Sequence, residues 1–264
     1  MCARRVGAIR TAFGMQATGL ASFAVVVWLL GRWPAFDQGM VPFAIALGVL
    51  GVISVAALYR GLALGPVAVV APVVASYVVI TVILVVIFLG ERLTTAQLVA
   101  ASVVFVGVVL TSTDARELRV TLGRPVPGVR IGLVATLGFG LWSAVFAIAT
   151  RQYAWIPMIL LLRATSFVFI GSYIAARRLD LRVFRVRTAL VLGATVGVLD
   201  TLANVFFARG IESGYASLAA TGTGMYPIIP AVLGMLALGE RLAPNQLAGI
   251  GLLVLGLVAL GAVS

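Results

Sequence analysis

Apolar stretches without a charged residue follow one another along most of the chain. Seven of them, each at least 20 residues long, cover 11–31, 38–59, 61–90, 93–113, 131–150, 213–239 and 242–264. Two more, at about 154–176 and 188–208, carry one charge each. Because about 20 apolar residues in a helix cross the hydrocarbon core of a bilayer, this pattern predicts nine transmembrane helices.

The stretches lack the alternation of apolar and polar residues that marks a lipid-facing β-strand. The composition agrees, since 62% of the residues are hydrophobic and 10% are charged, against roughly half and a quarter in a soluble domain. Helices satisfy their own backbone hydrogen bonds in lipid. We therefore expect an all-α polytopic membrane protein, multi-pass in the cell membrane, which in a bacterium is the plasma membrane, with the lipid bilayer around it.

The formal net charge is +11, which in a soluble protein would point to nucleic acid. Here the arginines lie mainly in the loops between apolar stretches, so membrane topology explains them and we expect no nucleic-acid partner. Histidine is absent and Cys2 is the only cysteine, which leaves no His/Cys metal cluster and no disulfide framework. We expect no cofactor and no enzymatic activity, because a membrane-embedded enzyme needs such groups or paired carboxylates.

One ten-residue segment occurs in two versions, LGERLTTAQL at 89–98 and LGERLAPNQL at 238–247. With the shift of 149 residues between them (89 to 238), 48–110 aligns with 197–259 without a gap. The charged and polar identities are Arg60/Arg209, Glu91/Glu240, Arg92/Arg241 and Gln97/Gln246. The copies cover three predicted helices each, at 40–62, 66–89 and 97–113, then 188–208, 214–238 and 245–262.

The two copies begin five helices apart, and because five is odd, they enter the membrane in opposite directions. Inverted repeats of this kind typically build alternating-access transporters, with the substrate site near the bilayer midplane.

The repeated segment also has a purely structural interpretation. Thr94 and Gln97 have the spacing of a capping box, and Pro244 stands at the first helical position of the second copy. The carboxylates and guanidiniums before these helix starts would fix two tight turns, one on each membrane face: Glu91, Arg92, Glu240 and Arg241. Gating or coupling is the alternative role.

The chain resembles the EamA-type transporters of the drug/metabolite transporter superfamily. Two segments carry the resemblance: 65–110, which contains VASYVVITVILVVIFLGERL, and 214–260, which contains GTGMYPIIPAVLGMLALGERL. The Tyr-Pro of such families is Tyr226-Pro227 in the second copy and Tyr77-Val78 in the first. The resemblance implies ten helices in two inverted five-helix units that carry small metabolites. It divides the chain into a half of four helices at 1–113, a connecting loop at 114–130 and a half of five helices at 131–264.

The first half departs from that ten-helix pattern. The counterpart of the helix at 131–150 would lie before Met1, so we expect either a chain truncated at its start or a nine-helix variant. Orientation is open as well. Most loop arginines lie on the side of the N-terminus, which favours a cytoplasmic N-terminus and an outside C-terminus, whereas the resemblance implies a C-terminus inside.

Only two charges interrupt predicted spans, and their signs are opposite. Arg163 lies 13 residues before the end of its helix at 176, and Asp200 lies 12 residues after the next helix begins at 188. At 1.5 Å per residue both lie roughly 18–20 Å from the same face, near the midplane. An unpaired charge there costs about 3 kcal/mol or more, so we expect an ion pair or a water-filled cavity.

Asp200 could bind a substrate amine or a proton, and Arg163 could bind a carboxylate. The alternative is a structural ion pair that joins two helices. Asn204 lies one turn from Asp200 and completes the first group of candidate substrate-binding residues.

A second group comes from the glycine- and proline-rich middle of the segment 213–239, where freed carbonyls can face a cavity. It consists of Tyr226 and Thr221, with Tyr77 as the equivalent of Tyr226 in the first copy; Gln16 and Trp142 are weaker candidates. The alternative is close helix packing by small residues. That packing role is also the one we expect for Gly61-xxx-Gly65, Gly193-xxx-Gly197 and Gly210-xxx-Gly214.

These features predict a membrane carrier of small organic metabolites or drugs that works by alternating access as an exporter. Proton coupling would rest on Asp200 or, with less support, on Glu212, and a homodimer is compatible with the sequence. The alternative function is a non-transporting membrane partner, such as a degenerate truncated paralogue. A lipid-carrier flippase remains a transport subtype.

Overall fold

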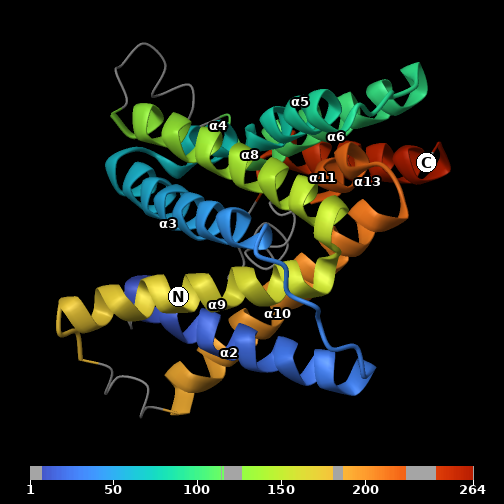
Figure 1. Ribbon diagram of the computed structural model, residues 1–264. Helices are drawn as coiled ribbons and strands as arrows, with labels where there is room; N and C mark the ends of the chain where they lie inside the picture. The colour runs from blue at the N-terminus through green and yellow to red at the C-terminus, as the bar shows by residue number, and fades with distance from the viewer. Residues whose placement is uncertain (1–7, 114, 116–126, 181–186, 224–241, 264) are drawn as a thin grey trace. The chain divides into compact units, whose positions relative to one another are not determined.

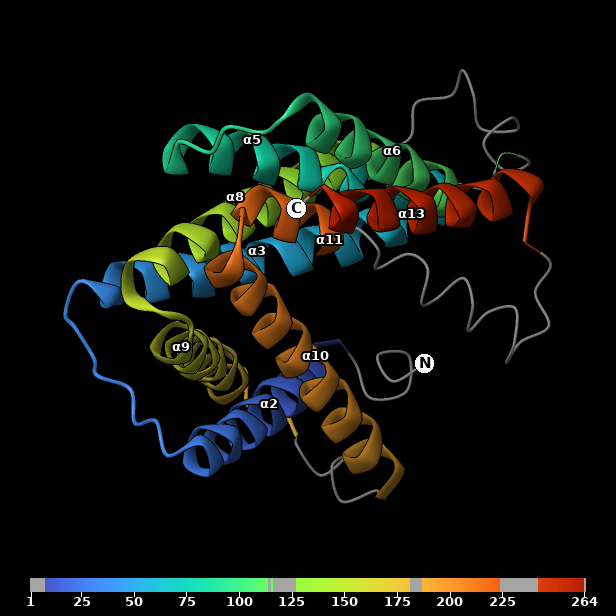
Figure 2. The same cartoon turned by 90° about the vertical axis from the view of Figure 1, so that its right-hand side faces the viewer.

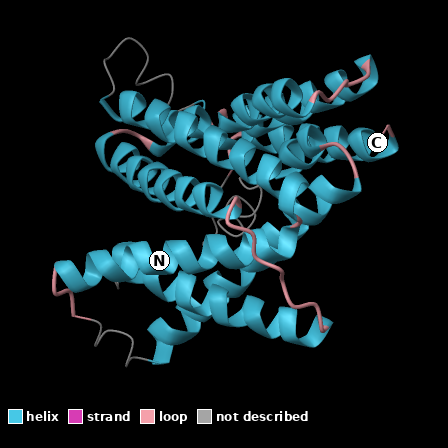
Figure 3. Ribbon diagram, in the orientation of Figure 1, coloured by secondary structure: helices cyan, strands magenta, loops and turns pink. Residues whose placement is uncertain are grey.

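The computed structural model describes residues 8–113, 115, 127–180, 187–223 and 242–263, and within these ranges the regular structure is helical, without a strand (Figure 3). Figure 1 labels the helices. Their bounds are α2 Ala8–Leu30, α3 Met40–Leu64, α4 Val67–Ala75, α5 Tyr77–Leu89, α6 Thr95–Ser112, α8 Pro127–Tyr153, α9 Trp155–Ala176, α10 Arg187–Ser213, α11 Ala216–Thr223 and α13 Pro244–Ala262. The predicted all-α class is confirmed.

Eight of the nine predicted spans have a helix long and apolar enough to cross a membrane in the described part of the chain. The ninth, at 213–239, lies largely outside the described residues, which include only its first part as α11. The predicted helix at 66–89 is one of the eight spans, Val69–Leu89, and it has a single-residue break at Ser76, between α4, which ends at Ala75, and α5, which begins at Tyr77. Pro72, inside α4, has no N–H to donate to the preceding turn, which weakens the helix near this point.

The chain folds into two compact units, and each is described by itself. The first unit combines 1–49 with 149–212, and the second combines 50–148 with 213–264. The boundaries therefore fall within α3 and within α8, and each unit draws helices from both predicted halves of the chain.

In the first unit, α2 packs against α9 and α10. Its contact with α9 includes stacked rings of Phe13 and Phe167, whose centroids are 5.1 Å apart. Its contact with α10 is a backbone approach at Gly197, where an added methyl group would lie 2.6 Å from the carbonyl oxygen of Met15. The close-packing role predicted for Gly193-xxx-Gly197 is confirmed, and Thr18 donates a hydrogen bond to the carbonyl of Gly193 across the same contact, at 3.2 Å.

Three apolar clusters lie within the described residues of the second unit. The first joins α3, α4 and α8 through Ala57, Val70, Val74 and Ala135; the second joins α4, α6 and α13 through Ala75, Val104, Val108 and Leu253; the third joins α6, α11 and α13 through Ala100, Leu218 and Leu260. Gly61-xxx-Gly65 packs α3 against α8 as predicted, since a methyl group on Gly128 would lie 2.6 Å from the Gly61 oxygen and 2.8 Å from the Gly65 nitrogen.

The helices α6 and α13 lie side by side in both views (Figures 1 and 2), and they are antiparallel. Gln97, near the start of α6, donates to the carbonyl of Val263 just beyond the end of α13, at 3.0 Å. Asn245, near the start of α13, donates to the carbonyl of Thr113 at the end of α6, at 2.7 Å. Because α6 and α13 are equivalent segments of the repeat, the predicted inversion is confirmed for this pair.

The contact between α6 and α13 repeats the symmetry of the sequence. A methyl group on Gly107 would lie 2.7 Å from the Leu253 nitrogen, and one on Gly256 would lie 2.9 Å from the Val104 nitrogen. The repeat shift of 149 residues converts Gly107 into Gly256 and Val104 into Leu253. The two copies therefore meet through the same backbone contact made twice, as a local two-fold axis requires.

Candidate functional site

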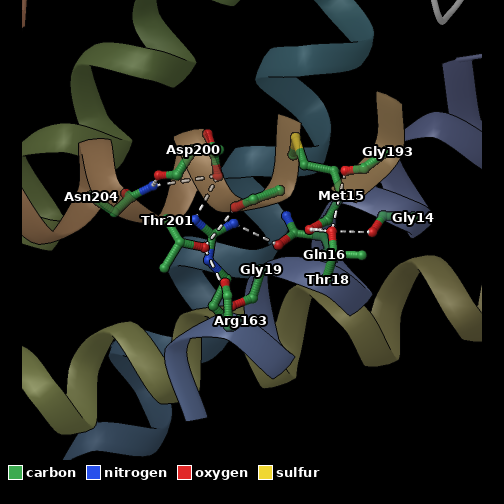
Figure 4. Close-up of polar contacts among 12 residues, drawn as sticks. Gly14, Met15, Gln16, Thr18, Gly19, Arg163, Gly193, Asp200, Thr201 and Asn204 are labelled. Atoms are coloured by element: carbon green, nitrogen blue, oxygen red, sulfur yellow. Dashed lines mark hydrogen bonds and ion pairs between the residues drawn. The ribbon is translucent and has the colours of Figure 1, made fainter. Parts of the chain in front are cut away.

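The two charges inside the predicted spans form an ion pair in the first unit. Arg163 of α9 and Asp200 of α10 face each other, with 2.6 Å between Nη2 and Oδ2 (Figure 4). The pairing predicted from their equal depth is confirmed. Since two opposite charges near the midplane neutralise each other, neither has to enter the membrane alone.

A third helix contributes to the same cluster. Gln16 of α2 accepts a hydrogen bond from Nη1 of Arg163 at 2.9 Å (Figure 4). The backbone of α2 also comes close, because a methyl group on Gly19 would lie 3.3 Å from Nη1 of Arg163 and 2.9 Å from the hydroxyl of Thr201. The guanidinium is thus held between an amide on one side and a carboxylate on the other, and the glycine leaves room for it.

The two partners of the ion pair differ in exposure. The side chain of Arg163 is 2% exposed, whereas that of Asp200 is 39% exposed. Nε of Arg163 is buried and has no hydrogen-bond partner among the described residues, and the N–H groups of Nη2 are not aligned for a hydrogen bond despite the short distance to Asp200. The interaction between the two side chains is therefore an ion pair without an aligned hydrogen bond. Of the two side chains, that of Asp200 is the one exposed at the surface.

Asn204 lies one helical turn beyond Asp200 on α10. Its Nδ2 donates to the backbone carbonyl of Asp200 at 2.7 Å and approaches the carboxylate Oδ2 at 3.5 Å. The oxygen Oδ1 of each of these two residues has no hydrogen-bond or ion-pair partner within the part of the chain that the structure describes. Two acceptor oxygens one turn apart are thus available on this face of α10.

The second group of candidate residues belongs to the second unit. The hydroxyl of Tyr77 on α5 lies 3.4 Å from that of Thr223 on α11, and its ring lies 5.8 Å from that of Phe139. Thr221 is 2% exposed and donates its hydroxyl to the carbonyl of Ser217 at 2.9 Å. Tyr226 lies outside the described residues. Substrate binding by Asp200, Arg163, Asn204, Tyr77, Thr221 and Tyr226 stays a prediction.

The repeated turn performs several structural roles. Gly90 ends α5 with a positive φ of 66°, a conformation that glycine adopts without strain. Thr94 accepts from the amide of Gln97, and Gln97 accepts from the amide of Thr94, so the predicted capping box is confirmed. Pro244 begins α13 as predicted, with Gln246 accepting from the amide of Ala243.

Glu91 contacts a helix that is distant in the sequence. Its carboxylate accepts hydrogen bonds from the backbone amides of Ala216 and Ser217, at 2.6 and 3.0 Å, and from the hydroxyl of Ser217 at 2.5 Å. The first turn of a helix has free amides and a positive dipole end, which a carboxylate satisfies. Glu91 therefore caps α11 and joins the first copy to the second. Sequence reasoning assigned Glu91 to its own turn and missed this contact; Glu240 and Arg241 lie outside the described residues.

A cleft of about 650 Å³ opens at the helix ends of the first unit. It is lined by 35–37, Met40, 150–154 and Glu212. Arg163 and Asp200 do not line it, so the cleft and the ion pair are separate features of this unit.

The described chain has eight helical spans of membrane length, an antiparallel contact between equivalent repeat segments, and an ion pair between two of the spans. Together these features define a class, the multi-pass helical membrane proteins built from an inverted repeat. The family model of the EamA-like transporter family matches residues 1–113 and 126–262. The chain therefore belongs to the EamA-like transporter family. It is a multi-pass membrane protein of the drug/metabolite transporter superfamily.

A solved crystal structure of a protein is similar to this chain with a TM-score of 0.75 and 17% sequence identity. The similarity covers 99% of this chain and 91% of that chain. At this identity the likeness shows the fold, and the fold agrees with the family. No curated protein matches the chain in sequence.

Proposed function

We propose that this protein carries small organic solutes, metabolites or drugs, across the cell membrane by alternating access, and that it acts as an exporter. Asp200, Arg163 and Asn204 form the centre of the substrate site in this proposal. Tyr77, Thr221 and Tyr226 would line the transport path.

The antiparallel contact of α6 with α13 is the observation that supports the proposal most strongly. Equivalent segments that run in opposite directions allow two halves of a carrier to exchange conformations, so that the same site opens first to one side and then to the other. A packing scaffold has no need of this inversion. An ionisable pair at mid-membrane is the second support, because such residues are costly in lipid and typically serve transport.

Solute flux in liposomes that contain the purified protein tests the proposal. The panel includes amino acids, sugars, nucleobases and organic amines, and flux is compared with that of empty liposomes. We expect at least one class to move, from the cytoplasmic side outward, and we expect Asp200→Asn to lower that flux at least tenfold. Asp180→Asn makes the same chemical change at an exposed loop position and should leave the flux within twofold.

Liposomes that move no member of the panel faster than empty ones would contradict carriage and would favour the non-transporting partner. If flux is present and Asp200→Asn retains it, carriage stands and the assignment of the site is wrong.

A further inference from the structure

We propose that the site on α10 selects organic cations that carry an N–H group, with the ammonium bound to Oδ1 of Asp200 and Oδ1 of Asn204. Arg163 is then a positioning residue that orients the carboxylate and does not itself meet the solute. This inference rests on the proposed function, because it names the substrate class of the same site.

The difference in exposure indicates which charge a solute meets. Arg163 is 2% exposed and enclosed by α2, whose Gln16 binds Nη1 and whose Gly19 backbone lies close to the guanidinium. Asp200 is 39% exposed and uses Oδ2 for Arg163. An approaching solute therefore reaches the carboxylate first, at an oxygen that has no partner among the described residues.

The sign of the charge follows from this order. A cation beside Asp200 places the negative carboxylate between two positive charges, those of the solute and of Arg163. Both of its contacts are then attractive. An anion would have to pass Asp200 to reach Arg163, and it would bring two negative charges together in a medium that screens them weakly. The buried guanidinium is also pinned by Gln16 and cannot turn outward without losing that hydrogen bond.

Asn204 adds a requirement for hydrogen-bond donors. The side-chain atom of Asn204 that faces the backbone carbonyl of Asp200 must be the nitrogen Nδ2, because a carbonyl only accepts hydrogen bonds. The other terminal atom of the side chain is therefore the oxygen Oδ1, which is available as an acceptor. The two free oxygens lie on residues four apart in a helix and therefore share one face. A primary or secondary ammonium can donate to both, whereas a quaternary ammonium has no N–H to donate.

Binding to the purified protein in lipid nanodiscs tests the inference without requiring transport. The probes are butyl, benzyl and phenylbutyl compounds, each as the ammonium, the alcohol and the carboxylate, together with benzyltrimethylammonium. In at least one series we expect the ammonium to bind at least tenfold more tightly than its alcohol and carboxylate. We also expect benzylammonium to bind more tightly than its quaternary analogue if the benzyl series is the one selected.

Three variants locate the effect. Asp200→Asn should reduce the preference for the ammonium to less than threefold. That change leaves Arg163 buried without its counterion and could prevent folding, so the double variant Arg163→Gln/Asp200→Asn, which carries no charge at the site, should fold and show the same loss. Asp180→Asn should bind as the unmodified protein does.

The inference is overturned if no ammonium binds, if an alcohol or carboxylate binds as tightly as the ammonium, or if the double variant keeps the preference. Carriage is judged separately. A protein that moves solutes in liposomes without favouring ammonium probes contradicts this inference alone, whereas ammonium binding that depends on Asp200 without any flux contradicts the proposed function alone.

Discussion

At the scale of single residues, the repeated turn shows how many roles a short segment can combine. Gly90 ends one helix, Thr94 and Gln97 begin the next, and Glu91 caps a third that starts 125 residues away. Gln97 in addition donates to the carbonyl of Val263, just beyond the end of α13. A segment with this many partners tolerates few substitutions, which gives a physical reason for its presence in both copies.

Replacing Glu91 by glutamine tests the cap on α11. The substitution removes the charge and replaces one acceptor oxygen by an amide nitrogen, so one of the two backbone amides, of the fully buried Ala216 or Ser217, loses its partner. We expect a loss of about 1–3 kcal/mol of unfolding free energy. Denaturation by sodium dodecyl sulfate in mixed micelles, followed by circular dichroism, measures it.

The matched control for this substitution is Arg92→Gln, at the exposed neighbouring position, which should change stability by about 0.5 kcal/mol or less. Equal effects of the two substitutions would mean that the cap contributes nothing measurable.

The ion pair and the cap differ in how far sequence could predict them. Arg163 and Asp200 are the only charges inside two consecutive spans, so their depths could be compared by counting residues. Glu91 stands beside a helix start of its own, and nothing in its neighbourhood points to α11. The contact with Gln16 was equally hidden, because it depends on the rotation of α2 about its axis, and an apolar helix with few polar residues does not reveal that rotation.

At the scale of elements, glycine decides how closely helices approach. Lipid tails are as apolar as leucine side chains, so helices in a membrane gain little from the hydrophobic effect and associate through close packing. The contact of α6 with α13 follows this rule, with Gly107 and Gly256 opposite backbone atoms. Of the three glycine pairs that the sequence identified at a spacing of four, two pack as predicted, whereas a methyl group on Gly214 would have no neighbour within 4 Å among the described residues. The isolated glycines of α6 and α13 carried no such pattern.

Two glycines of α13 give a paired test of this packing. A methyl group at position 256 would lie 2.9 Å from the nitrogen of Val104, whereas one at position 251 would have no atom within 4 Å. We expect Gly256→Ala to cost about 1–3 kcal/mol through overpacking. Gly251→Ala should stabilise by about 0.5–1 kcal/mol, because alanine favours the helix.

Unfolding curves of these two variants under identical detergent conditions provide the comparison. If Gly256→Ala were as stable as Gly251→Ala, the two helices could not be in backbone contact at that point.

At the scale of the whole molecule, the repeat in the sequence predicted the relative direction of equivalent helices, but the division of the chain into halves did not predict the compact units. The odd number of helices between the copies required opposite directions, and α6 and α13 have them. The compact units, in contrast, each combine segments of both halves. Sequence comparison finds what is repeated along the chain, but the exchange of helices between copies depends on which apolar surfaces fit together, and apolar surfaces built from the same few residue types look alike in sequence.

The inversion has a direct readout in intact cells. Single cysteines are introduced as Arg92→Cys, before α6, and Pro244→Cys, at the start of α13, in a chain with Cys2→Ser. We expect a membrane-impermeant maleimide to label one position from outside and the other only after the membrane is permeabilised, since α6 and α13 are antiparallel. Labelling of both positions from the same side would contradict the inverted arrangement.

The ion pair also bears on how the polypeptide enters the membrane during its synthesis. Arg163 emerges from the ribosome before Asp200, and the span that holds Asp200 has the lowest mean hydropathy of the eight described spans, 1.2. Each charge alone costs about 3 kcal/mol at mid-bilayer. If α9 and α10 leave the protein-conducting channel of the insertion machinery together as a hairpin, the two charges are already paired and this cost is lowered. The same two side chains proposed to receive a solute thus help their own helices to insert, and a mutation at either is expected to reduce the amount of protein in the membrane as well as its activity.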